Sequence, residues 1–180
     1  MKLRYVIRSL WEEFKLKLRV LQAAGAAFIL GGDITPTGRL FAAVIHKDGS
    51  REELGLICTK VVTDAGVAYI VDSFQNLVEL ENMRYHASGT GVTAEAASQT
   101  ALVTEVATRQ SGTLTEGASA NIFRTVGTIT YAGAFAITEH GIFSAASAGT
   151  LLDRSVFAAI NVVASDAIQF TYELTMPSGS

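Results

Sequence analysis

Apolar side chains recur at a helical spacing near the start of the chain. Steps of three and four residues separate Leu3, Ile7, Leu10, Phe14, Leu18 and Leu21. Positions so spaced share one face of an α-helix, so this pattern predicts a helix over residues 2–22. Val6 and Trp11 widen the apolar face, and charged side chains occupy the other side. Such a helix either packs on its own domain or projects as an arm that docks on a neighbouring subunit.

Glycine and proline interrupt the chain after this helix. Gly25, the pair Gly31-Gly32 and the run from Asp33 to Gly38 are strong breakers of regular structure. We therefore expect an N-terminal helical arm over residues 1–22, a connector over residues 23–38 and a β domain over residues 39–180.

Beyond the connector the hydrophobic pattern is typical of β-strands. From Ile168 to Met176 every even position is apolar and every odd position is polar, which is the period of a strand with one buried face. Further strands are expected over residues 39–46, 51–62, 82–87, 122–131, 134–143 and 151–163. Asp48-Gly49, between the first two, predicts a tight hairpin. A short helix is expected over residues 64–76, capped by Thr63 or Asp64.

Turns are frequent, and helices do not alternate with strands. The expected fold is mainly β: an antiparallel β-sandwich or barrel, jelly-roll-like, with an N-terminal amphipathic helix and one short internal helix. Small residues fill segments 88–98 and 111–120, and we expect both to be surface loops.

The charge of the chain is low and unevenly distributed. Only 17% of the 180 residues are charged, against about 25% in typical soluble domains, so the surface suits contact with other proteins. Residues 1–21 hold six lysines and arginines against two glutamates, whereas the remainder holds eight basic and fifteen acidic residues. An acidic body disfavours nucleic-acid binding. The basic arm instead predicts an acidic protein partner, a second copy of this chain included.

The sequence predicts neither a membrane helix nor a signal peptide, and it contains one cysteine. The apolar window Val20–Leu30 is shorter than the about twenty residues that a membrane helix needs, so no membrane contact is expected. Charged residues as far as Arg19 are also atypical of a signal peptide. Cys58 is the single cysteine and lies in an apolar run, which excludes an internal disulfide and predicts a small buried hydrophobe.

The histidines and acidic residues do not form a catalytic or metal-binding motif. His46, His86 and His140 are far apart, and none has a second ligand at helical spacing. Glu139 and His140 are neighbours that would face opposite sides of a strand, with a turn expected near Gly141. No metal site, cofactor or catalytic residue is predicted.

Two further short motifs favour structural roles. Ser88-Gly89-Thr90-Gly91 superficially resembles a phosphate-binding loop but lacks the following lysine, so a flexible connector is expected. Asp153 and Arg154 would face opposite sides of a strand, each pairing across strands or with a neighbouring subunit.

Four segments resemble virion structural proteins of tailed bacteriophages, over roughly residues 60–176: Tyr85–Gly91, Thr100–Glu105, Ala136–Phe143 and Gly149–Arg154. The resemblance implies a non-enzymatic capsid decoration (cement) protein that stabilises the head through repeated subunit contacts. A neck, tail or fibre-attachment protein is the alternative, since related sequences occur in tail-fibre and collar modules. A receptor- or carbohydrate-binding β module comes third, and a hydrolase last.

The resemblance also implies partners and a location. These are the major capsid protein or other virion proteins, further copies of the chain in a homo-oligomer with a trimer favoured, and the virion, assembled in the host bacterial cytoplasm. The arm supplies the candidate assembly interface, which comprises Leu3, Arg4, Ile7, Arg8, Leu10, Trp11, Phe14 and Lys15.

Overall fold

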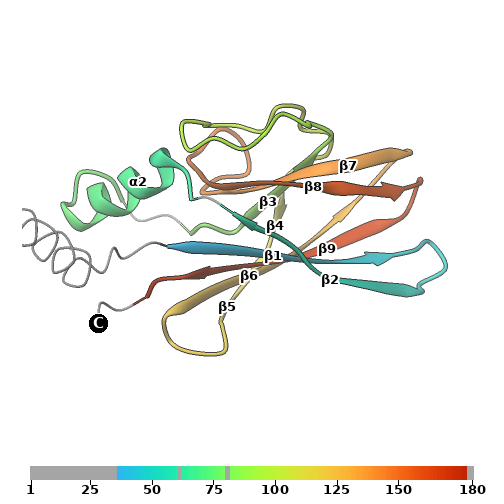
Figure 1. Cartoon of the computed structure of the whole chain (residues 1–180), viewed down its shortest axis with the longest axis horizontal. Helices are drawn as coiled ribbons and strands as arrows, with labels where there is room; N and C mark the ends of the chain where they lie inside the picture. Colours follow the sequence, from blue (N-terminus) through green and yellow to red (C-terminus); the bar gives the residue numbers. More distant parts are fainter. Residues whose placement is uncertain (1–35, 61, 80–81, 178–180) are drawn as a thin grey trace, which may run out of the picture. The chain divides into compact units, whose positions relative to one another are not determined.

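A computed structural model describes residues 36–60, 62–79 and 82–177 of the chain. The strands of this part form two antiparallel β-sheets, accompanied by a helix (Figure 1). The predicted arm over residues 1–22, with all eight candidate interface residues from Leu3 to Lys15, lies outside the described residues, as does nearly all of the connector.

The first sheet has five strands, and every neighbouring pair is antiparallel. Their order across the sheet is β2 (Arg51–Lys60), β1 (Thr37–Ile45), β9 (Ala167–Thr175), β6 (Ile122–Thr130) and β5 (Thr113–Glu116). The second sheet has four antiparallel strands in the order β4 (Gln110–Ser111), β3 (Tyr85–Gly89), β7 (Phe135–Phe143) and β8 (Leu151–Val162). The expected mainly β, antiparallel class is confirmed.

Strand β9 has the predicted alternation. Ile168, Phe170 and Tyr172 are at most 1% exposed, and the polar residues between them are partly exposed. Glu173 is the exception, because Arg124 on β6 covers its carboxylate with a contact of 2.7 Å. An ion pair therefore satisfies the one acidic side chain that the strand buries.

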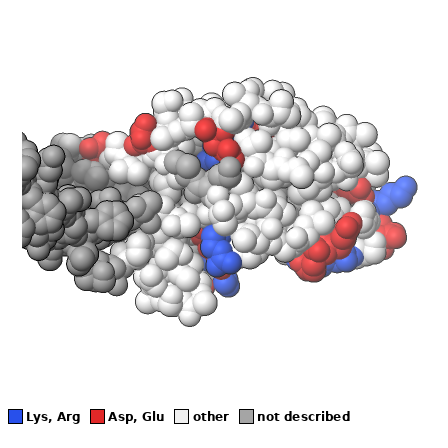
Figure 2. Space-filling model, viewed as in Figure 1, with Lys and Arg blue, Asp and Glu red and all other residues white. Residues whose placement is uncertain are grey.

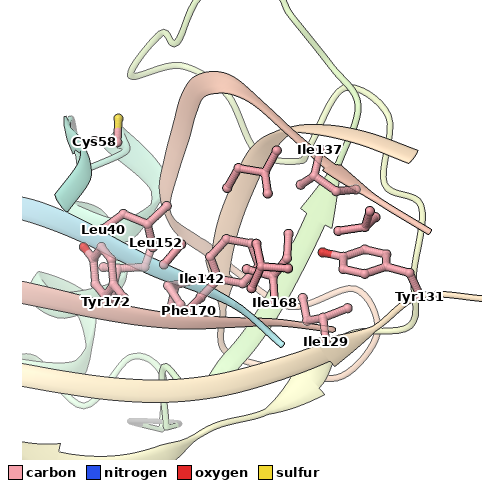
Figure 3. Packing of buried hydrophobic residues seen from close by; sticks show 14 of the residues in the cluster. Leu40, Cys58, Ile129, Tyr131, Ile137, Ile142, Leu152, Ile168, Phe170 and Tyr172 are labelled. Atoms are coloured by element: carbon pink, nitrogen blue, oxygen red, sulfur yellow. The ribbon is translucent and has the colours of Figure 1, made fainter. Parts of the chain in front are cut away.

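Buried residues of both sheets meet in one hydrophobic cluster (Figure 3). Leu40 and Phe170 come from the first sheet, and Ile137 and Leu152 come from the second. Cys58 is buried beside this cluster, as predicted, and its Sγ lies 3.5 Å from the carbonyl oxygen of Val156.

The expected hairpin and short helix are both present. Gly49 has φ +84°, and its N–H donates to the carbonyl of His46, which closes the turn between β1 and β2. Helix α2 spans Asp64–Phe74 and begins at the Thr63 N-cap, whose hydroxyl accepts a hydrogen bond from the N–H of Gly66. No helix in the described part of the chain has the length and apolar character needed to cross a membrane.

Three local expectations are wrong. Segment 111–120 was expected to be a surface loop, but it contains the end of β4 and all of β5, which are held by backbone pairing with β3 and β6. Strand β3 begins and ends later than the expected 82–87 and takes in Ser88 and Gly89. Gly141 lies within β7, paired with Ala87 and Arg154, so no turn occurs there.

Candidate functional site

A completely buried ion pair links β7 to β8. Glu139 and Arg154 have side chains that are 0% and 1% exposed. The Arg154 Nε donates to Glu139 Oε2 at 2.9 Å, and Nη2 lies 2.7 Å from the same oxygen. The expectation that Arg154 pairs across strands is confirmed.

Backbone amides of the segment between β3 and β4 complete the coordination of the Glu139 carboxylate. Oε1 accepts from the N–H groups of Gly91 at 3.0 Å and Thr104 at 2.7 Å, and Oε2 accepts from Val103 at 3.0 Å. Burial acts to raise the pKa of Glu139, but the Thr104 and Val103 amides and Arg154 outweigh it, so the pKa lies below its ordinary value. Glu139 is therefore a buried carboxylate that stays ionised.

The segment from Ser88 to Gly91 is not the flexible connector that its composition predicted. Gly91 donates its amide to an anion, as the glycines of a phosphate-binding loop do, but the anion is the chain's own Glu139. A Cβ atom at Gly91 would lie 2.5 Å from Glu139 Oε1, so the carboxylate occupies the space that a side chain would need.

A buried histidine pair lies on the other side of β7. His86 Nδ1 is 3.0 Å from His140 Nε2, and His86 Nε2 is 3.1 Å from the Thr125 hydroxyl on β6. Burial lowers the pKa of His86 to about 3, and burial together with His86 lowers the pKa of His140 well below its ordinary value. Both rings are neutral, so one of the two facing nitrogens carries a proton and donates it to the other, which accepts.

Small residues make room for this pair. The His86 ring reaches from the second sheet to Gly127 of β6, and a Cβ at Gly112 would lie 2.7 Å from its Nε2. Sequence spacing did not reveal the pair, because 54 positions separate the two histidines. As predicted, His140 and Glu139 contact different elements, since neighbours on a strand face opposite ways.

A third buried polar contact joins the sheets through Asp153. The Tyr172 hydroxyl of β9 lies 3.3 Å from Asp153 Oδ2, and the Ser155 hydroxyl donates to Oδ1 at 3.0 Å. Burial raises the pKa of Asp153 to about 7, with a further contribution from the nearby charge of Glu95. This carboxyl therefore holds a proton more readily than an ordinary aspartate does.

These groups are chemically suited to holding the fold together. Glu139, His86, His140, Asp153 and Arg154 are each at most 1% exposed, so substrate does not reach them in this conformation. Within residues 36–60, 62–79 and 82–177, no group of three or more His, Cys, Asp and Glu side chains is arranged to hold a metal ion.

The described surface offers instead an apolar region around α2. A hollow of about 250 Å³ lies beside the helix, and its lining is apolar except for Asn82. The lining residues are Tyr69, Ile70, Asn82, Met83, Leu114, Phe123, Leu152 and Leu174. Next to it, five large apolar side chains are exposed by between 37% and 83%: Val67, Val71, Phe74, Leu77 and Val78. We call these five residues and the hollow together the α2 face.

The α2 face could be found only in part from the sequence. Helical spacing indicated the apolar positions of α2, but an apolar stripe ordinarily predicts burial. In the structure α2 buries Gly66 against Leu152, and most of its larger apolar side chains stay at least partly exposed. The unusual feature is thus the exposure, which only the packing reveals.

Comparison with known proteins finds no family model that matches this sequence. No curated protein and no solved structure shows significant similarity to it either.

Proposed function

We propose that this chain is a non-enzymatic structural protein of a tailed-bacteriophage particle, and within that class a capsid decoration protein. Its role is mechanical. Many copies make individually weak contacts with the major capsid protein and with one another, and repetition raises the effective concentration of each contact. The resemblance of segments such as Ala136–Phe143 to virion proteins supports this assignment.

One observation carries the proposal: the described chain exposes apolar side chains around α2, while Glu139 and the histidine pair described above are enclosed. Phe74 is 83% exposed and Leu77 is 67% exposed, whereas Glu139 and His86 are 0% exposed. Exposed apolar groups gathered in one region are typical of protein–protein contact sites. Most of the described residues visible in Figure 2 are neither basic nor acidic, which also suits coverage by neighbouring subunits.

We also infer that the two sheets form a β-sandwich. One hydrophobic cluster takes residues from both sheets, and each sheet keeps two edge strands, β2 and β5 in the first and β4 and β8 in the second. A barrel would pair those edges along their length, whereas the chain after β2 meets β8 at the single described bridge between Val62 and Asp153. Small sandwiches with exposed apolar groups are suitable modules for covering junctions between capsid subunits.

Protein counting and imaging on intact particles test the proposal. The particle whose genome encodes this sequence is purified, the copy number of the chain is measured by quantitative mass spectrometry, and the chain is located with a labelled antibody. Hundreds of copies on the head are expected. A copy number near six or twelve at the neck or tail would favour the alternative, a neck, tail or fibre-attachment protein, and absence from the particle would refute both.

A further inference from the structure

We propose that the α2 face receives the predicted N-terminal helix, residues 2–22, of a second copy of this chain. The inference rests on the proposed structural role, in which copies contact one another, and it names the surface at which they do so. The evidence is the shape of the apolar region, the charge around it and the place where the chain enters the first sheet.

The exposed stripe of α2 continues directly from its buried side. With about 3.6 residues per turn, Val67, Val71 and Phe74 share one face of the helix, and Ile70 lies between this face and Gly66. Gly66 packs on Leu152, and Ile70 lines the hollow. A partner helix placed along the stripe would therefore contact Val67, Val71 and Phe74 and cover the mouth of the hollow. The predicted arm offers a matching apolar stripe that includes Ile7, Leu10 and Phe14.

The charges around the two surfaces are complementary. Residues 61–84, which contain α2, include four acidic residues, Asp64, Asp72, Glu79 and Glu81, against one basic residue, Arg84, whose Nε donates to the carbonyl of Gly112. The arm has the opposite balance, with six basic residues against two glutamates in positions 1–21. Opposite charges around an apolar contact favour this pairing and disfavour pairing of two α2 faces or of two arms.

The described chain starts at the end of the first sheet that also carries the hollow of the α2 face. In the first sheet Gly38 of β1 lies opposite Leu174 of β9, and Leu174 lines the hollow. The described part of the chain thus begins at the end of the first sheet where the hollow lies. Residues 23–36 can span up to about 50 Å at about 3.6 Å per residue, which is enough for an arm to reach an adjacent copy.

Site-directed cross-linking of full-length chains tests this pairing. In a Cys58→Ser background, one variant carries Phe14→Cys and a second, with a different tag, carries Val71→Cys. The two are mixed and oxidised, and cross-linked heterodimers are separated by mass. Val163→Cys is the matched control, because Val163 is 51% exposed but lies beside the turn at Asp166, which contacts the β1–β2 hairpin. A heterodimer with Val71→Cys and none with Val163→Cys is expected, and equal capture by both positions would overturn the inference.

A second measurement uses Phe74→Asp, whose exposed position lets the variant fold. Sedimentation equilibrium is expected to show self-association weakened by about thirtyfold, which corresponds to about 2 kcal/mol at about 1.4 kcal/mol per tenfold change. Val92→Asp, in an exposed loop position, is the control and should associate like the parent chain. Unchanged association of Phe74→Asp would overturn this inference and leave the proposed function standing. Absence of the chain from particles would instead refute the proposed function, whatever the cross-links show.

Discussion

The carboxylate of Glu139 joins three parts of the molecule. It lies on β7, pairs with Arg154 on β8 and accepts hydrogen bonds from Gly91, Val103 and Thr104 in the segment between β3 and β4. Arg154 extends the contact by donating to the carbonyl of Thr93 at 3.0 Å. This one side chain therefore ties the long segment between β3 and β4 to both β7 and β8.

Replacement of Glu139 is expected to destabilise the fold strongly. Glu139→Gln keeps the shape but leaves the Arg154 charge buried without a counter-charge, and we expect a loss of about 3–5 kcal/mol in the free energy of unfolding. Urea denaturation measures it. Glu53→Gln is the control, because Glu53 pairs with Arg51 at an exposed position, where ion pairs contribute about 0–1 kcal/mol. Equal effects of the two substitutions would contradict this account of the pair.

Gly91 provides a second test of the same site. Gly91→Ala places a methyl group against the Glu139 carboxylate, and we expect a loss of about 1–3 kcal/mol from overpacking. Gly133→Ala is the matched control, because its methyl group would meet only the Phe135 ring at an ordinary 3.7 Å. Its effect should stay within about 0.5 kcal/mol. Equal unfolding midpoints for the two variants would show that the segment moves aside freely.

At the residue scale, the sequence indicates the local character of a residue better than it indicates which distant residue it contacts. The glycines at 89 and 91 indicate a loop whose amides can surround an anion, but the anion, Glu139, lies 48 positions beyond Gly91. The sequence likewise gives no sign that His86 and His140 are in contact. Contacts of this length depend on the pairing of β3 with β7, which local spacing does not encode.

Helix α2 depends on a single capping residue at its start. The Thr63 hydroxyl accepts from the Gly66 N–H at 3.0 Å and donates to the carbonyl of Leu151 at 2.5 Å, so it both begins the helix and ties it to β8. Thr63→Ala is expected to lower the free energy of unfolding by about 1–2 kcal/mol. Thr63→Ser, which keeps the hydroxyl, should lose less. Thermal unfolding followed by circular dichroism compares the two, and equal losses would show that the hydroxyl is not responsible.

The histidine pair between the sheets makes stability depend on pH. The unfolded chain takes up protons on His86 and His140 below their ordinary pKa of 6.5, whereas the fold keeps both neutral. The histidine pair therefore costs no stability above pH 6.5, and its cost grows as the pH falls below that value. Asp153 acts in the opposite sense, because its pKa rises from 3.8 to about 7 on folding, so the fold gains from its protonation below pH 7.

Two histidines outweigh one aspartate, so a net loss of about 1.4 kcal/mol per pH unit is expected below pH 6.5. Urea denaturation at pH 5, 6, 7 and 8 measures it, with the maximum expected between pH 6.5 and 7. Asp153→Asn removes the carboxyl that takes up a proton in the folded state, so the free energy of unfolding should fall more steeply with decreasing pH in this variant. A free energy of unfolding that stays constant from pH 5 to pH 7 would show that the pair is not held neutral.

At the element scale, regular patterns led to correct strands and small residues led to errors. Strand β9 was predicted because its alternating side chains face a core on one side. Segment 111–120 lacks such alternation, yet β5 forms there because its backbone pairs with β6, for example Thr113 opposite Val126. Backbone hydrogen bonds form with almost any side chain. A short edge strand therefore needs no alternation of apolar and polar residues, and hydrophobic periodicity does not predict it.

At the scale of the whole molecule, charge is scarce, and part of it lies inside the fold. Only 17% of the residues are charged, and of these Glu139, Asp153, Arg154, Asp166 and Glu173 are buried. The buried charges form contacts between strands and turns, and the surface of the described residues has few charges. A subunit covered by neighbours can have such a surface, whereas a free monomer would remain prone to association.

Deletion of residues 1–22 tests the division of the molecule into arm and body. Residues 36–177 form a compact unit with its own hydrophobic cluster, so the shortened chain should keep a cooperative urea transition. Self-association should be lost, because the deletion removes the helix proposed to dock on the α2 face of a neighbour. Sedimentation equilibrium measures this, and full-length Leu10→Asp, which disrupts only the apolar stripe, should reproduce the loss. An unfolded product would show that the arm belongs to the core of its own subunit, and persistent oligomers would show that copies associate through another surface.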